Sequence, residues 1–226
     1  NVGGTDYPVT LIDAVAFRNS STITQVNLGN NVTTIGPEAF RSVTGLTTIS
    51  FPDSVTTIGN TAFDQDTNLA SVTFGSGLTT IGVSAFAGTN LGSVTIPDSV
   101  TTIGDFAFII AHIHTLVIGS GVTSIGDSAF GSNLSLGIVR FLGTNAPAIN
   151  PFAFSQSGDA TFYRQPGGTG WPTTTFEHPI QAVAGPSITA APVSVEVPRN
   201  GATTLTVGAD GNGSGVTYQW KEDGPP

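Results

Sequence analysis

The sequence predicts a repeat solenoid, a fold in which one short structural unit stacks on copies of itself. The first observation is a motif in which an isoleucine is followed four residues later by the pair Ala-Phe. A second observation is that an apolar, strand-like alternation returns at a similar distance from each phenylalanine. A period in the twenties is too short for a domain and too long for a coiled-coil heptad, so we expect coils of 22–24 residues. The seven phenylalanines are spaced by 23, 23, 23, 22, 22 and 24 residues, at Phe17, Phe40, Phe63, Phe86, Phe108, Phe130 and Phe154.

Each copy begins with an extended stretch whose apolar residues stand at positions i, i+3 and i+5. Leu46, Ile49 and Phe51 form one such set, and the spacing returns in the following copies. This alternation, flanked by β-branched residues, is typical of a strand. A proline or a glycine ends the stretch, because both residue types interrupt strands, and a two-residue turn comes next.

Each copy continues with a second extended segment and a tight turn. The segment Val-Thr-Thr-Ile-Gly occurs at 32–36, 55–59 and 100–104, with close variants in other copies. We expect the Ala-Phe pair to lie on a single short helical turn, because Pro37-Glu38 and Asp105 suit the first turn of a helix. The alanine allows close packing, and the phenylalanine fills the centre of the coil. One copy buries too little apolar surface to offset the entropy of ordering its backbone, so only the array is stable.

The complete pattern, L-x-x-[IV]-x-[IF]-[PG]-x-x-[VL]-T-[TS]-I-G-x-x-A-F, resembles the BspA-like leucine-rich repeat over residues 8–154. The resemblance implies a leucine-rich-repeat-like, β-rich solenoid with short helical turns. It also implies a binding role at an extracellular or bacterial cell-surface location, because such repeats occur in bacterial and protist surface proteins. The family often carries cysteine in the loop after the phenylalanine, where this chain has residues such as Asp66, Gly88 and Ser132. We therefore expect no cross-link or bound metal in that loop.

The period ends near residue 160, and the remaining segment differs in character. Thr161-Phe162-Tyr163 reads as one more strand, and Gly170-Trp171 resembles a turn that closes such arrays. Further on, Tyr218-Gln219-Trp220 resembles the tryptophan region of an immunoglobulin-like domain, which needs about 100 residues. We therefore expect a partial β-sandwich segment, cut off within its domain and ordered only in part. The predicted regions are a solenoid at 1–159, a cap and linker at 160–185, and a truncated immunoglobulin-like domain at 186–226.

The composition excludes several classes of partner. Charged residues make up 9% of the chain, and the formal net charge is −9 with a single lysine. Binding nucleic acid or an anionic membrane surface needs basic clusters, so we expect no nucleic-acid partner. No apolar run approaches the roughly 18 residues of a membrane span, so we expect no membrane insertion. The chain has no cysteine, which excludes disulfides and thiolate sites but assigns no compartment. No signal peptide is visible at Asn1, so the chain is either intracellular or already trimmed, and its Thr/Ser/Gly/Asn-rich texture favours a trimmed, secreted protein.

The residues between the strand anchors are candidates for ligand binding, because they face outward and repeat at the coil spacing. Small hydrogen-bonding side chains in such rows fit an extracellular protein or a glycan. The same side chains can instead simply tolerate a tightly spaced ladder, and the rows offer no aromatic platform for a sugar. Val117 and Ile138 occupy two positions of these rows. The predicted ligand-binding residues are Gln25, Asn27, Thr48, Ser50, Ser71, Thr73, Ser93, Thr95, Thr115 and Arg140.

Three other features have structural explanations that compete with a function. A second row of threonines, which includes Thr33 and Thr123, is compatible with ice binding and equally with strand propensity. His112 and His114 can share a strand face, but no third ligand accompanies them, so we expect no metal site. The glycine-rich segment 210–215 matches the front half of a calcium loop, but position twelve is a lysine instead of glutamate. We expect no cofactor.

Catalysis has no recognisable signature in the sequence. The three histidines lie in no triad pattern, and the acidic residues stand mostly at turns. The main prediction is therefore a non-catalytic binding or adhesion module. The alternative is a structural spacer or a building block of an extracellular assembly, joined end to end or laterally. The two differ in the location of function, because a binder uses a lateral face and a building block uses its ends.

Overall fold

The computed structural model describes residues 8–171, 174–175 and 178–182. The chain divides into two compact units, Asn1–Ala182 and Val183–Pro226. The predicted immunoglobulin-like segment at 186–226, with its β-sandwich, lies outside the described residues. Among the described residues, no helix has the length and apolar character needed to cross a membrane.

The first unit is a parallel β-solenoid whose coils contribute short strands to two sides. On one side, seven two-residue strands form a single parallel sheet. Neighbouring strands pair equivalent residues of successive coils, as Thr34 pairs with Thr57 and Ile35 with Ile58. In sheet order the strands are β1 (Leu11–Ile12), β2 (Thr34–Ile35), β4 (Thr57–Ile58), β6 (Thr80–Ile81), β8 (Thr102–Ile103), β10 (Ser124–Ile125) and β12 (Ala148–Ile149).

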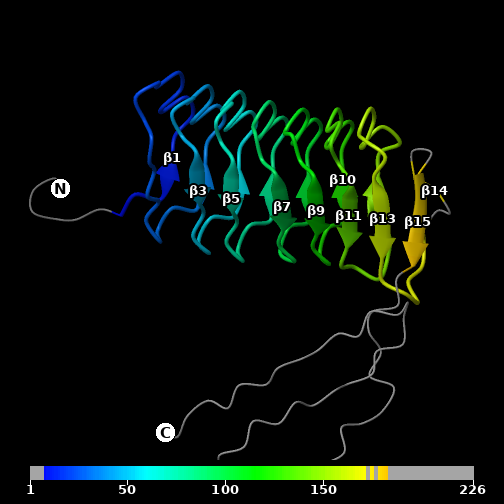
Figure 1. The fold of residues 1–226 in the computed structure, drawn as a ribbon. Coiled ribbons are helices and arrows are strands. Elements are labelled where there is room, and N and C mark those ends of the chain that lie inside the picture. Colours follow the sequence, from blue (N-terminus) through cyan, green and yellow to red (C-terminus); the bar gives the residue numbers. More distant parts are fainter. Residues whose placement is uncertain (1–7, 172–173, 176–177, 183–226) are drawn as a thin grey trace, which may run out of the picture. The chain divides into compact units, whose positions relative to one another are not determined.

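The second side carries longer strands, which lie next to one another along the array in Figure 1. Strands β3 (Thr48–Ser50) and β5 (Ser71–Thr73) pair in parallel. A further sheet has the order β14-β15-β13-β11-β9-β7, parallel except where β14 meets β15. Its strands are β7 (Ser93–Ile96), β9 (Thr115–Ile118), β11 (Ile138–Phe141), β13 (Thr161–Arg164), β14 (Thr174–Thr175) and β15 (His178–Ala182).

The repeat phenylalanines form one continuous column through the core, as their spacing predicts. Consecutive rings from Phe17 to Phe154 are stacked with centroids 5.1–5.3 Å apart. The five rings from Phe40 to Phe130 are at most 1% exposed, whereas Phe17 at the N-terminal end is 38% exposed. At the other end Phe162 meets Phe154 edge to face at 5.0 Å. Stacking of the aromatic rings adds to the stabilisation that burial of each ring provides.

The prediction of a short helical turn around Ala-Phe is wrong, because these residues form successive tight turns. In the second coil the Arg41 amide donates to the Glu38 carbonyl of its own coil, whereas the Phe40 amide donates to Ala62 of the next coil. Every second amide is thus used between coils, and a helix would need all of them within its own segment. The alternation places Glu38 and Ser42 in the left-handed region, at φ of 55° and 60°.

The corners after the long strands alternate between two sequences, Pro-Asp-Ser and Gly-Ser-Gly, in consecutive coils from residue 52 to residue 121. The glycines of one corner lie against the backbone of the previous coil. A Cβ atom on Gly77 would overlap the Asp53 carbonyl oxygen, and one on Gly75 would meet the Pro52 carbonyl. The glycine corner therefore fits the proline corner because it lacks side chains at two positions.

We expect Gly77→Ala to lower the free energy of unfolding by at least about 1–3 kcal/mol, because the new methyl group overlaps backbone atoms that cannot move independently. The matched control is Gly29→Ala, since a Cβ there would have no atom within 4 Å. The control is expected to be neutral or to stabilise by up to about 1 kcal/mol. Urea denaturation of the two variants checks the prediction, and equal midpoints would contradict it.

The two ends of the described array differ. At the C-terminal end the Trp171 indole N–H donates to the Thr144 carbonyl at 2.6 Å, and its ring meets Phe141 edge on at 4.9 Å. At the N-terminal end the first coil leaves apolar side chains accessible, with Val9 62% and Leu11 48% exposed. Trp171 therefore packs on the last described coils, whereas the first described coil has exposed apolar side chains.

Candidate functional site

The candidate site is the strand face, which we define as the outward side chains of β3, β5, β7, β9, β11 and β13. The alternation of buried and outward positions follows from the pleat of each strand. On β7, for example, Val94 and Ile96 are buried whereas Ser93 and Thr95 are exposed. Nine of the predicted residues are exposed and Thr115 is half-buried. Gln25 and Asn27 are exposed but lie before β3, in a segment without strand pairing.

Strand register brings these residues together in two groups. In the first, Thr48 stands opposite Ser71, and Ser50 opposite Thr73. In the second, Ser93 pairs with Thr115, and Thr95 with Val117. The register continues from Val117 to Arg140 on β11. No pairing joins β5 to β7 in the described part of the chain, so the two groups belong to separate sheets.

The polar side chains of the strand face are unused within the fold. In the part of the chain that the structure describes, no side-chain hydrogen bond involves the hydroxyls of Thr48, Ser50, Ser71, Thr73, Ser93 or Thr95. Neighbouring strands hold these groups about 4.8 Å apart. The face therefore offers a regular set of donors and acceptors to an external group.

The second threonine row has a structural role instead. The Thr56 hydroxyl donates to the Thr33 carbonyl at 3.2 Å, and the Thr79 hydroxyl donates to the Thr56 carbonyl at 3.0 Å. The same bond joins Thr101 to Thr79 and Thr123 to Thr101, at 3.2 and 3.1 Å. Each hydroxyl thus links its coil to the preceding one. This internal use accounts for the threonine at this position of the repeat.

Two residues that continue the strand face are missing from the predicted set. Tyr163 on β13 stands opposite Arg140, and Gln181 on β15 stands opposite Tyr163. Tyr163 supplies an aromatic ring that the predicted rows lack. The alternation in Thr161-Phe162-Tyr163 could have identified Tyr163 as an outward residue, because Phe162 is buried and its neighbour therefore points to the opposite side. The sequence pattern places Tyr163 in the cap because the repeat motif ends before it.

The histidines do not form a metal site in the described structure. Their Nδ1 atoms contact backbone carbonyls of the preceding coil, His112 with Thr89 at 2.9 Å and His114 with Gly92 at 3.3 Å. Among the described residues, no group of three or more histidine or carboxylate side chains is arranged to hold an ion. Both histidines instead extend the contacts between neighbouring coils.

Ionic contacts gather on the turn side of the array, away from the strand face. Glu38 binds Arg18 and Arg41, each at 3.1 Å, and Arg41 also binds Asp64 at 2.9 Å. Hydrogen bonds from Arg41 to Glu38 and Asp64 raise its pKa. These pairs join three successive coils. No carboxylate occupies an outward position on the described strands β3 to β13.

Two aspartates at the proline corners also connect successive coils. The Ser76 amide donates to Asp53, and the Ser120 amide donates to Asp98, at 2.7 and 2.6 Å. These hydrogen bonds hold the pKa of both carboxyl groups below the usual value for aspartate. The two aspartates therefore belong to the fold and are unsuited to proton transfer near neutral pH.

Asp66 is the most unusual ionisable residue of the described structure. Its side chain is fully buried behind the Phe63 turn, and Oδ1 accepts a hydrogen bond from the Val43 amide at 2.7 Å. Its other oxygen, Oδ2, is buried without a hydrogen-bond partner. Burial raises the pKa of this carboxyl to about 8. Asp66 is closed off from solvent, so we treat it as a feature of the core and not as part of a binding site.

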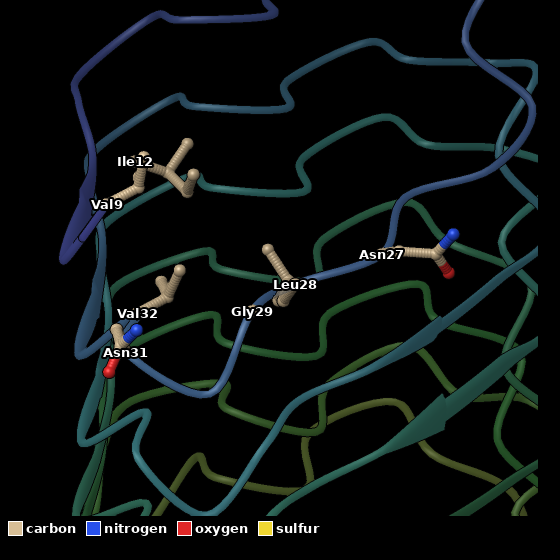
Figure 2. Close-up of a pocket in the computed structure, with 7 residues that line it drawn as sticks. All are labelled: Val9, Ile12, Asn27, Leu28, Gly29, Asn31 and Val32. Atoms are coloured by element: carbon tan, nitrogen blue, oxygen red, sulfur yellow. The ribbon is translucent and has the colours of Figure 1, made fainter. Parts of the chain in front are cut away.

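A cavity of about 330 Å³ lies at the N-terminal end of the array (Figure 2). Val9 and Ile12 border it on one side, and Leu28 and Val32 lie across from them. The cavity therefore lies between residues of the first two described coils.

Comparisons with known proteins agree with this geometry. The model of the BspA type leucine rich repeat region matches six copies over residues 10–137. A solved leucine-rich repeat protein from Bacteroides ovatus is 28% identical, with a TM-score of 0.63 over 70% of this chain and 43% of that chain. A leucine rich repeat protein from T. pallidum is also 28% identical, with a TM-score of 0.61 over 66% of this chain and 70% of that one. No curated protein matches the sequence.

The fold and the strand face define a class, the leucine-rich-repeat β-solenoids with about seven coils. Within that class, the chain belongs to the BspA type leucine rich repeat family, whose model matches more than half of it. Family and fold are those of repeat proteins that are generally non-catalytic. The chain spans less than half the length of the Bacteroides ovatus protein.

Proposed function

We propose that this chain is a non-catalytic binding or adhesion module of an extracellular or cell-surface protein, and that its strand face recognises a protein or a glycan. The observation that carries the proposal is the contrast between two rows of hydroxyl groups. The row that includes Thr56 and Thr79 is used between coils, whereas the hydroxyls of the strand face have no partner among the described residues. Groups that the fold leaves unused remain available to a ligand.

The rigidity of the array supports the same role. Ring stacking at 5.1–5.3 Å and the parallel ladders fix the spacing of the outward side chains before a partner arrives. A preorganised surface loses less conformational entropy on binding than a flexible one. Membership of the BspA type family supports an extracellular location, because such repeats occur in surface proteins. The combination favours recognition over a purely mechanical role.

We expect the double variant Thr73→Glu/Thr95→Glu to weaken binding of its partner at least tenfold. Both positions are exposed on the strand face, so the larger charged groups block contact without entering the core. The measurement is a screen of the full chain against immobilised glycans, matrix proteins and bacterial cells, followed by titration of each partner found. Circular dichroism verifies that the variant is folded.

The matched control is Val83→Glu/Thr102→Glu, which adds the same two charges at exposed positions on or beside the other sheet. It is expected to bind as the unmodified chain does. Equal loss in both variants would point to net charge instead of the strand face. A partner that binds both variants normally would contradict the proposal.

Exposed apolar residues in the first described coil favour a second candidate function, a building block that associates end to end. Its apolar residues Val9, Leu11 and Val15 are 48–62% exposed. If the screen finds no partner and the chain self-associates with increasing concentration, loss of that association in Val9→Glu would support this candidate.

A further inference from the structure

The strand face changes character along the array. Its outward positions on β3, β5 and β7 are all serine or threonine. On β9, β11 and β13 they include two aliphatic side chains, a cation and an aromatic ring. We call these four residues the C-terminal patch: Val117, Ile138, Arg140 and Tyr163.

Strand register makes these four residues neighbours. Arg140 pairs with Val117 on one side and with Tyr163 on the other. Ile138 lies two residues before Arg140 on the same strand and therefore on the same face, where it is 39% exposed. Parallel strands lie about 4.8 Å apart, so the row from Val117 to Tyr163 spans about 10 Å.

Arg140 is an unpaired cation within the described structure. Arg18 and Arg41 bind Glu38, and the Arg164 guanidinium donates to the Gln165 carbonyl and lies 6.0 Å from the Trp171 ring centroid. Arg140 has no ion pair, hydrogen bond or ring contact with any described residue. It is exposed on a face without a carboxylate, in a chain whose formal net charge is −9.

We infer that the C-terminal patch docks an extended segment of a partner protein that presents a carboxylate beside an aliphatic side chain. The inference rests on the proposed function and specifies which part of the strand face selects the partner. The planar guanidinium of Arg140 matches a carboxylate with two parallel hydrogen bonds. Val117 and Ile138 would bury the aliphatic group, and the Tyr163 ring would pack alongside. Arginine and tyrosine are also the residue types enriched at the centres of protein interfaces.

The aliphatic residues favour a protein over an acidic sugar. A sugar ring carries a hydroxyl on most carbons and needs hydrogen-bonding groups around it. The side chains of Val117 and Ile138 have no such group. The row of about 10 Å corresponds to about three residues of extended peptide. Side chains two residues apart in an extended segment lie on the same face, so such a segment can place a carboxylate on Arg140 and an aliphatic group on Val117 and Ile138.

The test is titration of three fluorescently labelled peptides of equal length into the full chain. Leucine alternates with Glu, Gln or Lys at every second position, with serine between them, so that both groups lie on one face of the extended peptide. We call these the Leu-Glu, Leu-Gln and Leu-Lys peptides. The Leu-Glu peptide is expected to bind at least tenfold more tightly than the other two, and its affinity should fall with added salt. Arg140→Gln is expected to remove this preference. The matched control Arg18→Gln makes the same change at an exposed arginine that is already paired with Glu38, and the preference should remain.

Two results would overturn the inference. One is equal binding of the Leu-Glu and Leu-Gln peptides, and the other is equal behaviour of Arg140→Gln and Arg18→Gln. A soluble polyuronate provides the competing probe, and its Arg140-dependent binding without binding of the Leu-Glu peptide would replace the protein partner by an acidic glycan. The proposed function and the inference can fail separately. If no peptide binds, but a partner found in the screen binds the unmodified chain and not Thr73→Glu/Thr95→Glu, the inference is overturned and the proposed function is supported.

Discussion

Replacing Phe86 by alanine is expected to lower the free energy of unfolding by about 3–5 kcal/mol. Phe86 is fully buried at the middle of the ring column, and its ring stacks on Phe63 and Phe108 at 5.2 Å. It also meets Phe74 edge to face at 5.6 Å. The substitution leaves a cavity and removes ring contacts on both sides. Because each coil is stabilised mainly by its neighbours, the loss also weakens the coupling between the two halves of the array.

Urea denaturation followed by circular dichroism measures the effect. The matched control is Phe152→Ala, the same substitution at a ring that is 62% exposed, with an expected cost below about 1 kcal/mol. Phe17→Ala should fall between the two, because Phe17 is 38% exposed and stacks on one repeat phenylalanine. Equal costs for Phe86→Ala and Phe152→Ala would contradict a column that carries the stability of the array.

Asp66→Asn is expected to stabilise the protein by about 1–3 kcal/mol at neutral pH, since it replaces a buried group whose Oδ2 has no partner. Asn133 occupies the same repeat position, three residues after the phenylalanine, and its side-chain amide is fully hydrogen-bonded. Its Oδ1 accepts from the Ile113 amide, and its Nδ2 donates to the carbonyls of Phe108 and Phe130. In the Asp66→Asn variant, we expect the new amide to donate to the equivalent carbonyls in its own region.

The pH dependence gives this prediction its sharpest test. The ordinary pKa of an aspartate is 3.8, and burial raises the pKa of Asp66 to about 8. Between these values the folded protein holds a proton that the unfolded chain has released. The stabilisation from this proton is complete below pH 3.8 and is lost as the pH rises toward 8. Within that window the contribution of Asp66 to the free energy of unfolding falls by about 1.4 kcal/mol per pH unit.

Denaturant titrations at about pH 5, 6, 7 and 8, which span this window, measure the difference between the unmodified chain and Asp66→Asn. The difference should grow with pH, because the asparagine has no proton to lose. Other titrating groups are common to both proteins and cancel in the comparison. Asp159→Asn, the same substitution at an exposed aspartate, serves as the matched control for the loss of one carboxyl group. Parallel pH profiles for the unmodified chain and Asp66→Asn would rule out the buried proton.

Much of the fold could be predicted from the sequence, because the apolar residues that fill the core recur at the same positions of every repeat. The phenylalanine spacing predicts a stacked column, and the centroid distances confirm it. The predicted helical turn is wrong because Glu38 and Phe40 send their amides to the next coil, a use that one copy alone does not reveal. Asp66 lies in a polar loop sequence, and nothing local indicates that its carboxyl is fully buried.

The period, the family and the residues that fill the core can be read from the sequence, because burial must repeat wherever the coil repeats. Which hydroxyl groups are used depends instead on tertiary contacts. Thr56 and Thr73 have the same chemistry, but only the Thr56 hydroxyl reaches the carbonyl of the preceding coil. Tertiary contacts also place Arg140 beside Tyr163, 23 residues later in the chain, without an acidic partner among the described residues. The physical reason is that stacking turns residues about one coil apart into neighbours, and their contacts depend on side-chain direction, which the repeat pattern alone does not specify.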